Sequence, residues 1–178
     1  MVSQSNLIVH SFGSNPITYQ LDECASDPDL VRECSKDGLI WVRKIPPGLR
    51  GKSDEIVVEY CQQKAFPLLT ADWQLPENEA ASLSRSHPGV IVVRSDSRGI
   101  MNTPFILSVL GLLKSRIENW HRLVLRNSII ELSSHGAIMQ RAENSQLVDR
   151  EYLDFSNPDW PDSFTSIVQA NCSRTDTT

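Results

Sequence analysis

Short apolar runs of strand type alternate with longer stretches of helical type along most of the sequence. The runs that are typical of strands span residues 17–21, 39–45, 66–70 and 90–94. The stretches with helical spacing span residues 27–38, 54–64 and 103–120, and a shorter irregular or helical piece covers 77–84. Strands and helices that alternate at these lengths form a mostly parallel sheet with helices on both of its faces. The pattern therefore predicts an α/β domain.

A different pattern follows the last long helix. Residues 128–132 and 137–140 are strand-type runs separated by a glycine-containing turn, which predicts a terminal β-hairpin. Beyond Arg141 the apolar pattern fades, while acidic and aromatic residues continue. We hypothesise that this C-terminal tail docks on its own domain, covers a substrate groove or binds a partner. The predicted division is an N-terminal tail (1–16), one domain (17–141) and an acidic, aromatic C-terminal tail (142–178).

Length, charge and composition exclude several classes of protein. With 178 residues the chain fits one domain, and its net charge of -5 argues against a protein that coats nucleic acid through overall positive charge. The sequence contains no apolar run of membrane-spanning length and no leader-like segment, which predicts a cytoplasmic protein without a membrane partner. The cysteines form no C-x-x-C pair and the histidines have no metal-ligand spacing, so we expect reduced, buried thiols and structural or surface histidines.

Acidic residues stand where the predicted elements start or stop. Asp22 ends the first strand, Asp54 opens the helix at 54–64, and Asp72 follows the third strand. The carboxyl ends of parallel strands meet at one edge of a sheet, so these acids are expected to converge there. Hard divalent ions prefer oxygen ligands, and hydrolysis of a phosphodiester with such an ion requires several carboxylates at one point. The pattern therefore favours one Mg²⁺ or Mn²⁺ site.

A phosphate-binding loop is the strongest rival interpretation. Residues 46–53 read PPGLRGKS, which ends in the G-K-S of such a loop and lies between a predicted strand and a predicted helix. The motif requires glycine five residues before Gly51, where this chain has Pro46. Proline has no backbone N–H to donate to a phosphate. We therefore favour a loop in which Arg50 and Lys52 contact substrate phosphates or solvent.

Four short segments, taken in order, resemble a known family. They are LDEC at 21–24, GKSDEIVVEYC at 51–61, LLTADW at 68–73 and PGVIVVR at 88–94. They look like the PIN-like fold, specifically the small prokaryotic PIN-like proteins that act as toxin components beside an antitoxin. The resemblance covers residues 17–141. It implies an endoribonuclease that cleaves single-stranded RNA with Mg²⁺ or Mn²⁺, with an antitoxin protein as a further partner, and it is compatible with a homodimer.

Carried over residue by residue, the resemblance makes Asp22, Asp54 and Asp72 the catalytic and metal-binding residues. Trp73 could stack against a nucleotide. The family often has a further acid at the position of Gln74, and Asn at the position of Cys24, so this chain departs from the pattern. A degenerate module that binds RNA or a protein without hydrolysis is therefore the alternative. The positions expected to support the acids or to contact substrate are Glu23, Glu55, Lys52, Arg50, Gln74 and Thr70.

Overall fold

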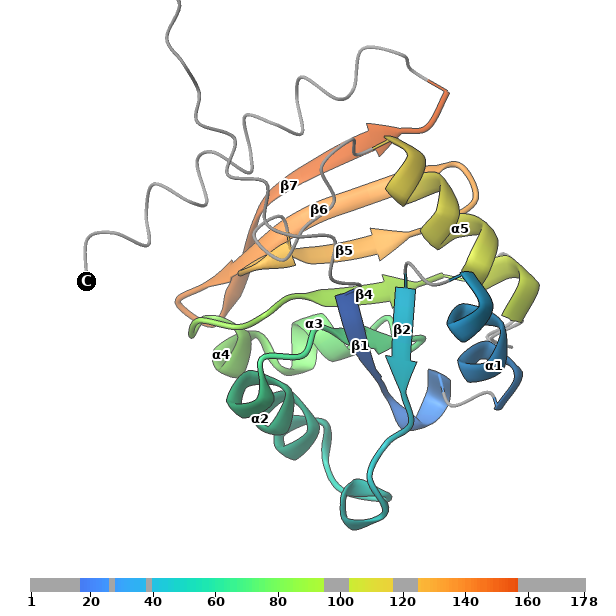
Figure 1. The fold of residues 1–178 in the computed structure, drawn as a ribbon. Coiled ribbons are helices and arrows are strands. Elements are labelled where there is room, and N and C mark those ends of the chain that lie inside the picture. The colour runs from blue at the N-terminus through green and yellow to red at the C-terminus, as the bar shows by residue number, and fades with distance from the viewer. Residues whose placement is uncertain (1–16, 26–27, 38–39, 95–102, 117–124, 157–178) are drawn as a thin grey trace, which may run out of the picture.

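A seven-stranded mixed sheet forms the centre of the protein (Figure 1). The computed structural model describes residues 17–25, 28–37, 40–94, 103–116 and 125–156. The strands are β1 (Ile17–Leu21), β2 (Ile40–Arg43), β3 (Leu68–Thr70), β4 (Val90–Val93), β5 (Ile129–Leu132), β6 (Gly136–Glu143) and β7 (Gln146–Asp154). Their order across the sheet is β2-β1-β3-β4-β5-β6-β7.

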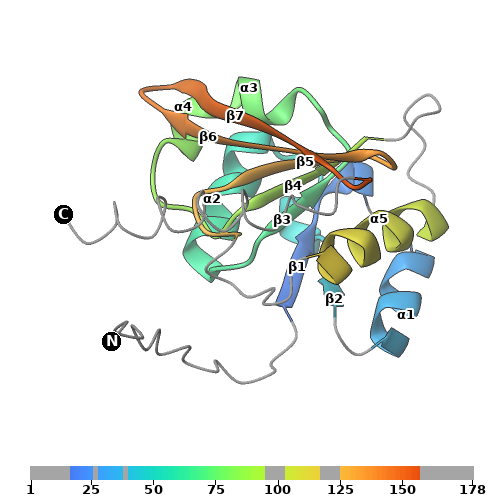
Figure 2. The same ribbon diagram turned by 90° about the horizontal axis from the view of Figure 1, so that it is seen from above.

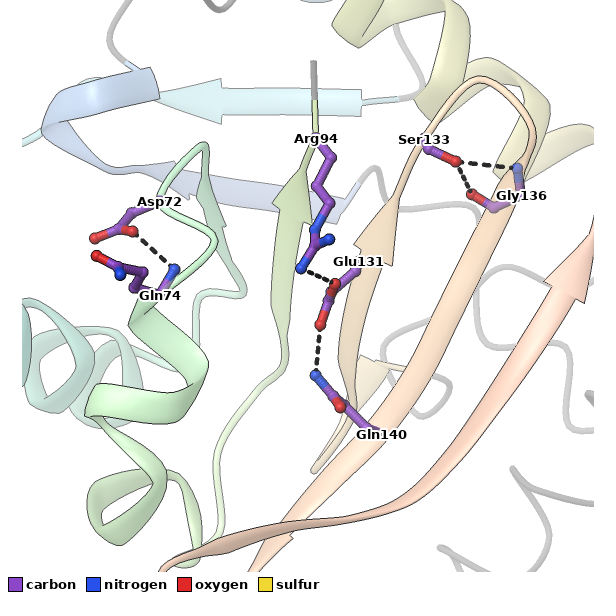
Figure 3. Close-up of polar contacts among 7 residues, drawn as sticks. All are labelled: Asp72, Gln74, Arg94, Glu131, Ser133, Gly136 and Gln140. Atoms are coloured by element: carbon purple, nitrogen blue, oxygen red, sulfur yellow. Dashed lines mark hydrogen bonds and ion pairs between the residues drawn. The ribbon is translucent and has the colours of Figure 1, made fainter. Parts of the chain in front are cut away.

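The first five strands of the sheet run parallel to one another, and the last two are antiparallel to their neighbours. The pairs β1–β2, β1–β3, β3–β4 and β4–β5 are parallel. The pairs β5–β6 and β6–β7 are antiparallel. The predicted α/β class with a mostly parallel sheet is confirmed, and so is the predicted hairpin of β5 and β6. In that hairpin, Ser133 Oγ accepts from the Gly136 N–H at 3.3 Å (Figure 3).

The helices overlap the stretches that the sequence predicted as helical, and both ends of α2 have a local cause. The helices are α1 (Pro28–Asp37), α2 (Asp54–Lys64), α3 (Leu75–Asn78), α4 (Ala80–Leu83) and α5 (Thr103–Arg116). In α2 the acids of the first turn complement the positive end of the helix dipole. The helix ends at Ala65, whose φ of 55° is left-handed and whose N–H bonds back to the carbonyl oxygens of Cys61 and Gln62. No helix in the described ranges is long and apolar enough to cross a membrane.

Two apolar clusters divide the side chains of the central strands between them. Neighbouring residues of one strand join different clusters, because successive strand side chains point in opposite directions. The first cluster includes Leu69, Ile91 and Ile130 of the sheet, Leu30 of α1, and Ile106 and Val109 of α5. The second includes Leu68, Val90 and Ile129 of the sheet, Val57 and Cys61 of α2, Leu75 of α3 and Leu83 of α4. Figure 2 shows α1 beside α5, apart from α2, α3 and α4.

The sheet continues beyond the boundary at residue 141 that the sequence predicted. Strand β6 extends to Glu143, and β7 pairs with it through a turn in which Asn144 and Ser145 have φ of 52° and 62°. Positive φ at both central residues is the geometry of a type I′ hairpin. Beyond β7, Phe155 is buried in the cluster that contains α5, so this part of the tail docks on the domain. The tail residues 1–16 and 157–178 lie outside the described residues.

The polar character of β7 explains why its strand pattern is weak. Most of its side chains face solvent; Tyr152, for example, is 61% exposed. The strand is held by its ladder of pairs with β6 rather than by an apolar face. Strand prediction from a sequence depends on alternating burial, which this edge strand lacks.

Candidate active site

The strand order reverses between β1 and β3. The chain leaves β1 toward β2 on one side, whereas it leaves β3 toward β4 on the other side. In open α/β sheets, ligands bind in the crevice beyond the carboxyl ends of the strands at such a reversal. Asp22 directly follows β1 and Asp72 lies two residues after β3. The structure therefore brings these two predicted site residues to the same edge of the sheet.

The strand register places Asp22 beside Thr70. Gln20 pairs with Leu68 and Leu21 pairs with Leu69, so the next residue of each chain comes level with the other. Leu68 packs in the cluster that contains α2, and strand side chains alternate with a period of two residues. Thr70, two residues after Leu68, consequently points toward the same side as α2. Both Asp22 and Thr70 are buried, with relative exposures of 6% and 0%.

The Thr70 hydroxyl connects the two acids that follow β1 and β3. Its Oγ1 donates to Asp22 Oδ2 at 2.8 Å and accepts from the backbone N–H of Asp72 at 3.0 Å. The other oxygen of Asp22 accepts from the backbone N–H of Glu23 at 2.6 Å. A buried carboxylate is costly unless hydrogen bonds compensate it, and these contacts provide that compensation. Asp22 is thereby fixed in position at the centre of the site.

The Cys24 thiol belongs to the same network. Its Sγ lies 3.0 Å from Asp22 Oδ2 and 3.2 Å from Thr70 Oγ1. Desolvation of the sulfur, opposed by the Thr70 hydrogen bond and reinforced by Asp22, raises the pKa of this thiol to about 11. The prediction of buried thiols is confirmed for Cys61 but wrong for Cys24, which is exposed. At Cys24 the polar network, rather than the apolar core, receives the side chain.

Asp54 reaches this edge from the first turn of α2. The pKa of its carboxyl is raised above the usual range, mainly by partial burial and then by the negative charges of Asp22 and Asp72. This electrostatic coupling indicates that the three acids share one region, because such effects decline with distance and screening. Ser53 precedes the helix as its N-cap but makes no side-chain capping bond. Within the described ranges, no hydrogen bond or ion pair engages the carboxylate of Asp54, so it remains available.

Asp72 and Gln74 form a short turn at the start of α3 (Figure 3). Asp72 Oδ1 accepts from the backbone N–H of Gln74 at 2.9 Å. Gln74 is the N-cap residue of α3, and its side chain is exposed. The main-chain N–H of Gln74 thus orients Asp72. The side chain of Gln74 places an amide where the PIN-like family that the sequence resembles often has an acid.

The loop before α2 is tied to the end of β1 by Glu23. The backbone N–H of Gly51 donates to Glu23 Oε2 at 2.9 Å. In a phosphate-binding loop this type of N–H would face the phosphate, but here a carboxylate already accepts from it. Gly51 has a φ of 67°, which suits a glycine. Arg50 and Lys52 are exposed on either side of it, where they are accessible to a substrate.

The oxygen donors suit a hard divalent ion, but their placement does not form a complete ligand set. No group of three or more His, Cys, Asp and Glu side chains in the described part of the chain is arranged to hold a metal ion. Asp22 is held by its hydrogen bonds, whereas Asp54 and Asp72 have unengaged oxygens within the described residues. Carboxylates of this kind are the ligands that Mg²⁺ and Mn²⁺ prefer, so the donor chemistry fits.

The sequence did not single out Glu79 or Glu131, whereas Arg94 stands at the end of a predicted strand and was expected at the same edge of the sheet as the acids. Glu79, at the junction of α3 and α4, has a pKa raised by partial burial and then by the charges of Glu55 and Asp54. Its neighbourhood depends on the packing of α4 against α2, which no local motif encodes. Arg94 and Glu131 form an ion pair of 2.8 Å between the ends of β4 and β5. The alternation of side chains along β4 and β5 would have predicted this ion pair only if the parallel register of the two strands had been known.

No family model, curated protein or solved structure matches the chain.

Proposed function

We propose that the protein is a metal-dependent endoribonuclease of PIN-like type that cleaves single-stranded RNA. The observation that carries this proposal is the Thr70-centred network, which holds Asp22 beside Asp72 at the strand-order reversal. The raised pKa of Asp54 supports a shared acidic site, because the charges of Asp22 and Asp72 contribute to it. The two apolar clusters support the finer assignment of a PIN-like sheet with helices on both faces.

The residues around the acids provide complementary roles in this mechanism. A bound Mg²⁺ or Mn²⁺ would lower the pKa of a coordinated water and offset charge on the reacting phosphate. Asp22, Asp54 and Asp72 would hold that ion. Arg50 and Lys52, exposed on the loop before α2, would contact the phosphates on either side of the scissile bond and reduce their repulsion from the acids.

The proposal extends to the biological setting that the sequence resemblance implies. Small prokaryotic PIN-like toxins are paired with an antitoxin protein, and we propose the same kind of partner here, with a homodimer as the oligomeric state. The resemblance supports this setting through the ordered segments that contain Asp22, Asp54 and Asp72. Co-expression with proteins encoded beside it, followed by measurement of complex mass, tests the partner separately from catalysis.

The decisive experiment is cleavage of an end-labelled single-stranded RNA with Mg²⁺, with Mn²⁺ and with chelator. We expect cleavage that requires the ion and falls at least about 100-fold in Asp72→Asn and Asp22→Asn, since loss of a ligand weakens charge stabilisation in the transition state. Glu151→Gln, on the exposed surface of β7, is the matched acid control and should cleave like the wild type. Cleavage that persists in chelator and in Asp72→Asn contradicts the mechanism.

A second candidate function is a PIN-like module that binds RNA or a protein without hydrolysis. It is favoured by the absence of a ready-made ligand set among the described side chains and by the amide of Gln74 in place of an acid. This candidate predicts RNA or protein binding that is unchanged by chelator, together with no cleavage at any ion concentration. The same labelled RNA therefore distinguishes the two functions when both binding and product formation are measured.

A further inference from the structure

An exposed tryptophan lies directly beside the acidic site. Trp73 follows Asp72 in the chain and is 54% exposed, although tryptophan is usually well buried. The guanidinium carbon of Arg94 lies over its ring, 5.9 Å from the ring centroid. An arginine at this distance interacts favourably with the face of an indole. The two side chains together present an aromatic surface with a positive charge above it.

Arg94 is held in this place by a buried carboxylate. Glu131 is 7% exposed, and its Oε2 lies 2.8 Å from Arg94 Nη2. The other oxygen, Oε1, accepts from Gln140 Nε2 at 2.8 Å, whereas Oε2 has the Arg94 ion pair but no hydrogen bond among the described residues (Figure 3). A buried charge requires an opposite charge nearby, and this requirement keeps the guanidinium of Arg94 close to Glu131. The network thus continues from β4 through β5 to β6.

The anchored arginine still has capacity for a ligand. Its side chain is 46% exposed, and one of its nitrogens contacts Glu131. A guanidinium carries five N–H donors, and the described residues offer Arg94 no second ion pair. A phosphate can therefore approach its outer edge, where planar arginine forms paired hydrogen bonds with phosphate oxygens.

Arg94 and the turn that contains Asp72 follow the paired ends of neighbouring strands. Val92 pairs with Thr70, the last residue of β3, and Arg94 directly follows β4. Figure 3 shows Arg94 at the end of β4, beside the turn that contains Asp72 and Gln74. The aromatic and positively charged surface therefore adjoins the three acids along one edge of the sheet.

We propose that Trp73 and Arg94 form a nucleotide-binding platform for single-stranded RNA, in which a base stacks on Trp73 and a backbone phosphate pairs with Arg94. The platform rests on the proposed nuclease function and assigns a substrate position next to the acids. Stacking on an exposed aromatic ring requires a base whose faces are free, which single-stranded RNA provides and a duplex does not.

The test measures binding of a labelled single-stranded RNA by fluorescence anisotropy in the presence of chelator, so that cleavage does not contribute. Trp73→Ala should weaken binding about 5- to 150-fold, the range associated with loss of one stacked base. Trp73→Phe should recover most of the lost affinity because it keeps an aromatic face. Tyr152→Ala removes an aromatic residue that is 61% exposed on the distant strand β7, and it should bind like the wild type. A duplex RNA should not distinguish Trp73→Ala from the wild type.

The role of Arg94 is tested with a double variant, because removal of the arginine alone leaves the Glu131 charge buried and unpaired. Arg94→Met combined with Glu131→Gln should lower the dependence of log affinity on log salt by about 0.7, the contribution of one phosphate contact in a single strand. Glu131→Gln alone keeps the positive charge and should keep the salt dependence. Circular dichroism of each variant verifies that it is folded.

The outcomes separate this inference from the nuclease proposal. Equal affinities of wild type, Trp73→Ala and the folded double variant for single-stranded RNA overturn the platform, whether or not the protein cleaves RNA. Weakened binding in Trp73→Ala, with recovery in Trp73→Phe, supports the platform even if the wild type cleaves nothing. In that last case the hydrolytic function fails and the RNA-binding alternative remains.

Discussion

Replacement of Thr70 by valine should destabilise the protein and disorder the acidic site at the same time. Valine has nearly the same shape but no hydroxyl, so it removes the bond to Asp22 Oδ2 at 2.8 Å and the bond from the Asp72 N–H at 3.0 Å. A hydrogen bond to a charged group contributes about 1.5–3 kcal/mol and a neutral one about 0.5–1.5 kcal/mol. Thr70→Val should therefore lower the free energy of unfolding by about 2–4 kcal/mol.

Urea unfolding, followed by tryptophan fluorescence, measures this loss. Thr70→Ser keeps the hydroxyl and loses one buried methyl group, so it should cost only about 1 kcal/mol. In a double-mutant cycle, Thr70→Val and Asp22→Asn should show a coupling of about 1–2 kcal/mol, because the two side chains are in direct contact. Equal stabilities of Thr70→Val and Thr70→Ser, or a coupling near zero, would refute the claim that the hydroxyl organises the site.

His87, Gly89 and Asp54 each affect stability in a way that can be measured. Burial lowers the pKa of His87 from 6.5 to about 4, so its contribution to folding stability is fully present above pH 6.5 and is lost as the pH falls toward 4. Urea unfolding should show that the wild type loses about 3 kcal/mol of stability over that range and that His87→Gln does not. Gly89→Ala should cost about 2–4 kcal/mol in the same assay, because φ is +118° and a Cβ would lie 2.5 Å from the Leu125 carbonyl oxygen; an unchanged midpoint would contradict this. Asp54→Asn should raise the melting temperature in chelator at pH 7, because the raised pKa of Asp54 means that folding disfavours its charged form. A lower melting temperature would contradict the repulsion of Asp54 by Asp22 and Asp72.

Local sequence signals were sufficient for most elements of the fold. The acids after Ser53 and the apolar spacing of the next turns predicted the start and end of α2, which the structure places at Asp54–Lys64. Each signal of this kind concerns residues within one or two turns of one another. The apolar run at 90–94 likewise predicted β4, found at Val90–Val93, because a strand buried on both faces is continuously apolar.

The elements that depend on pairing between distant segments could not be read in the same way. Strand β7 is polar and is defined by its ladder with β6, so its own sequence shows no apolar alternation. The Arg94–Glu131 ion pair depends on the parallel register of β4 and β5. The positions of Asp22 and Asp72 at one edge could be predicted because strand ends share an edge in any parallel sheet. Their support by the Thr70 hydroxyl required knowledge that β1 lies next to β3.

Calorimetric titration of Mn²⁺ into the protein at pH 7 without RNA measures directly whether the three acids bind one cation. The claim that Asp22, Asp54 and Asp72 form one cation site predicts binding to the wild type that weakens at least about 10-fold in each of the three Asp→Asn variants. Glu151→Gln, an exposed acid on β7, should bind like the wild type. Absence of Mn²⁺ binding by the wild type, or binding that survives all three substitutions, would contradict a shared metal site at the β1–β3 edge.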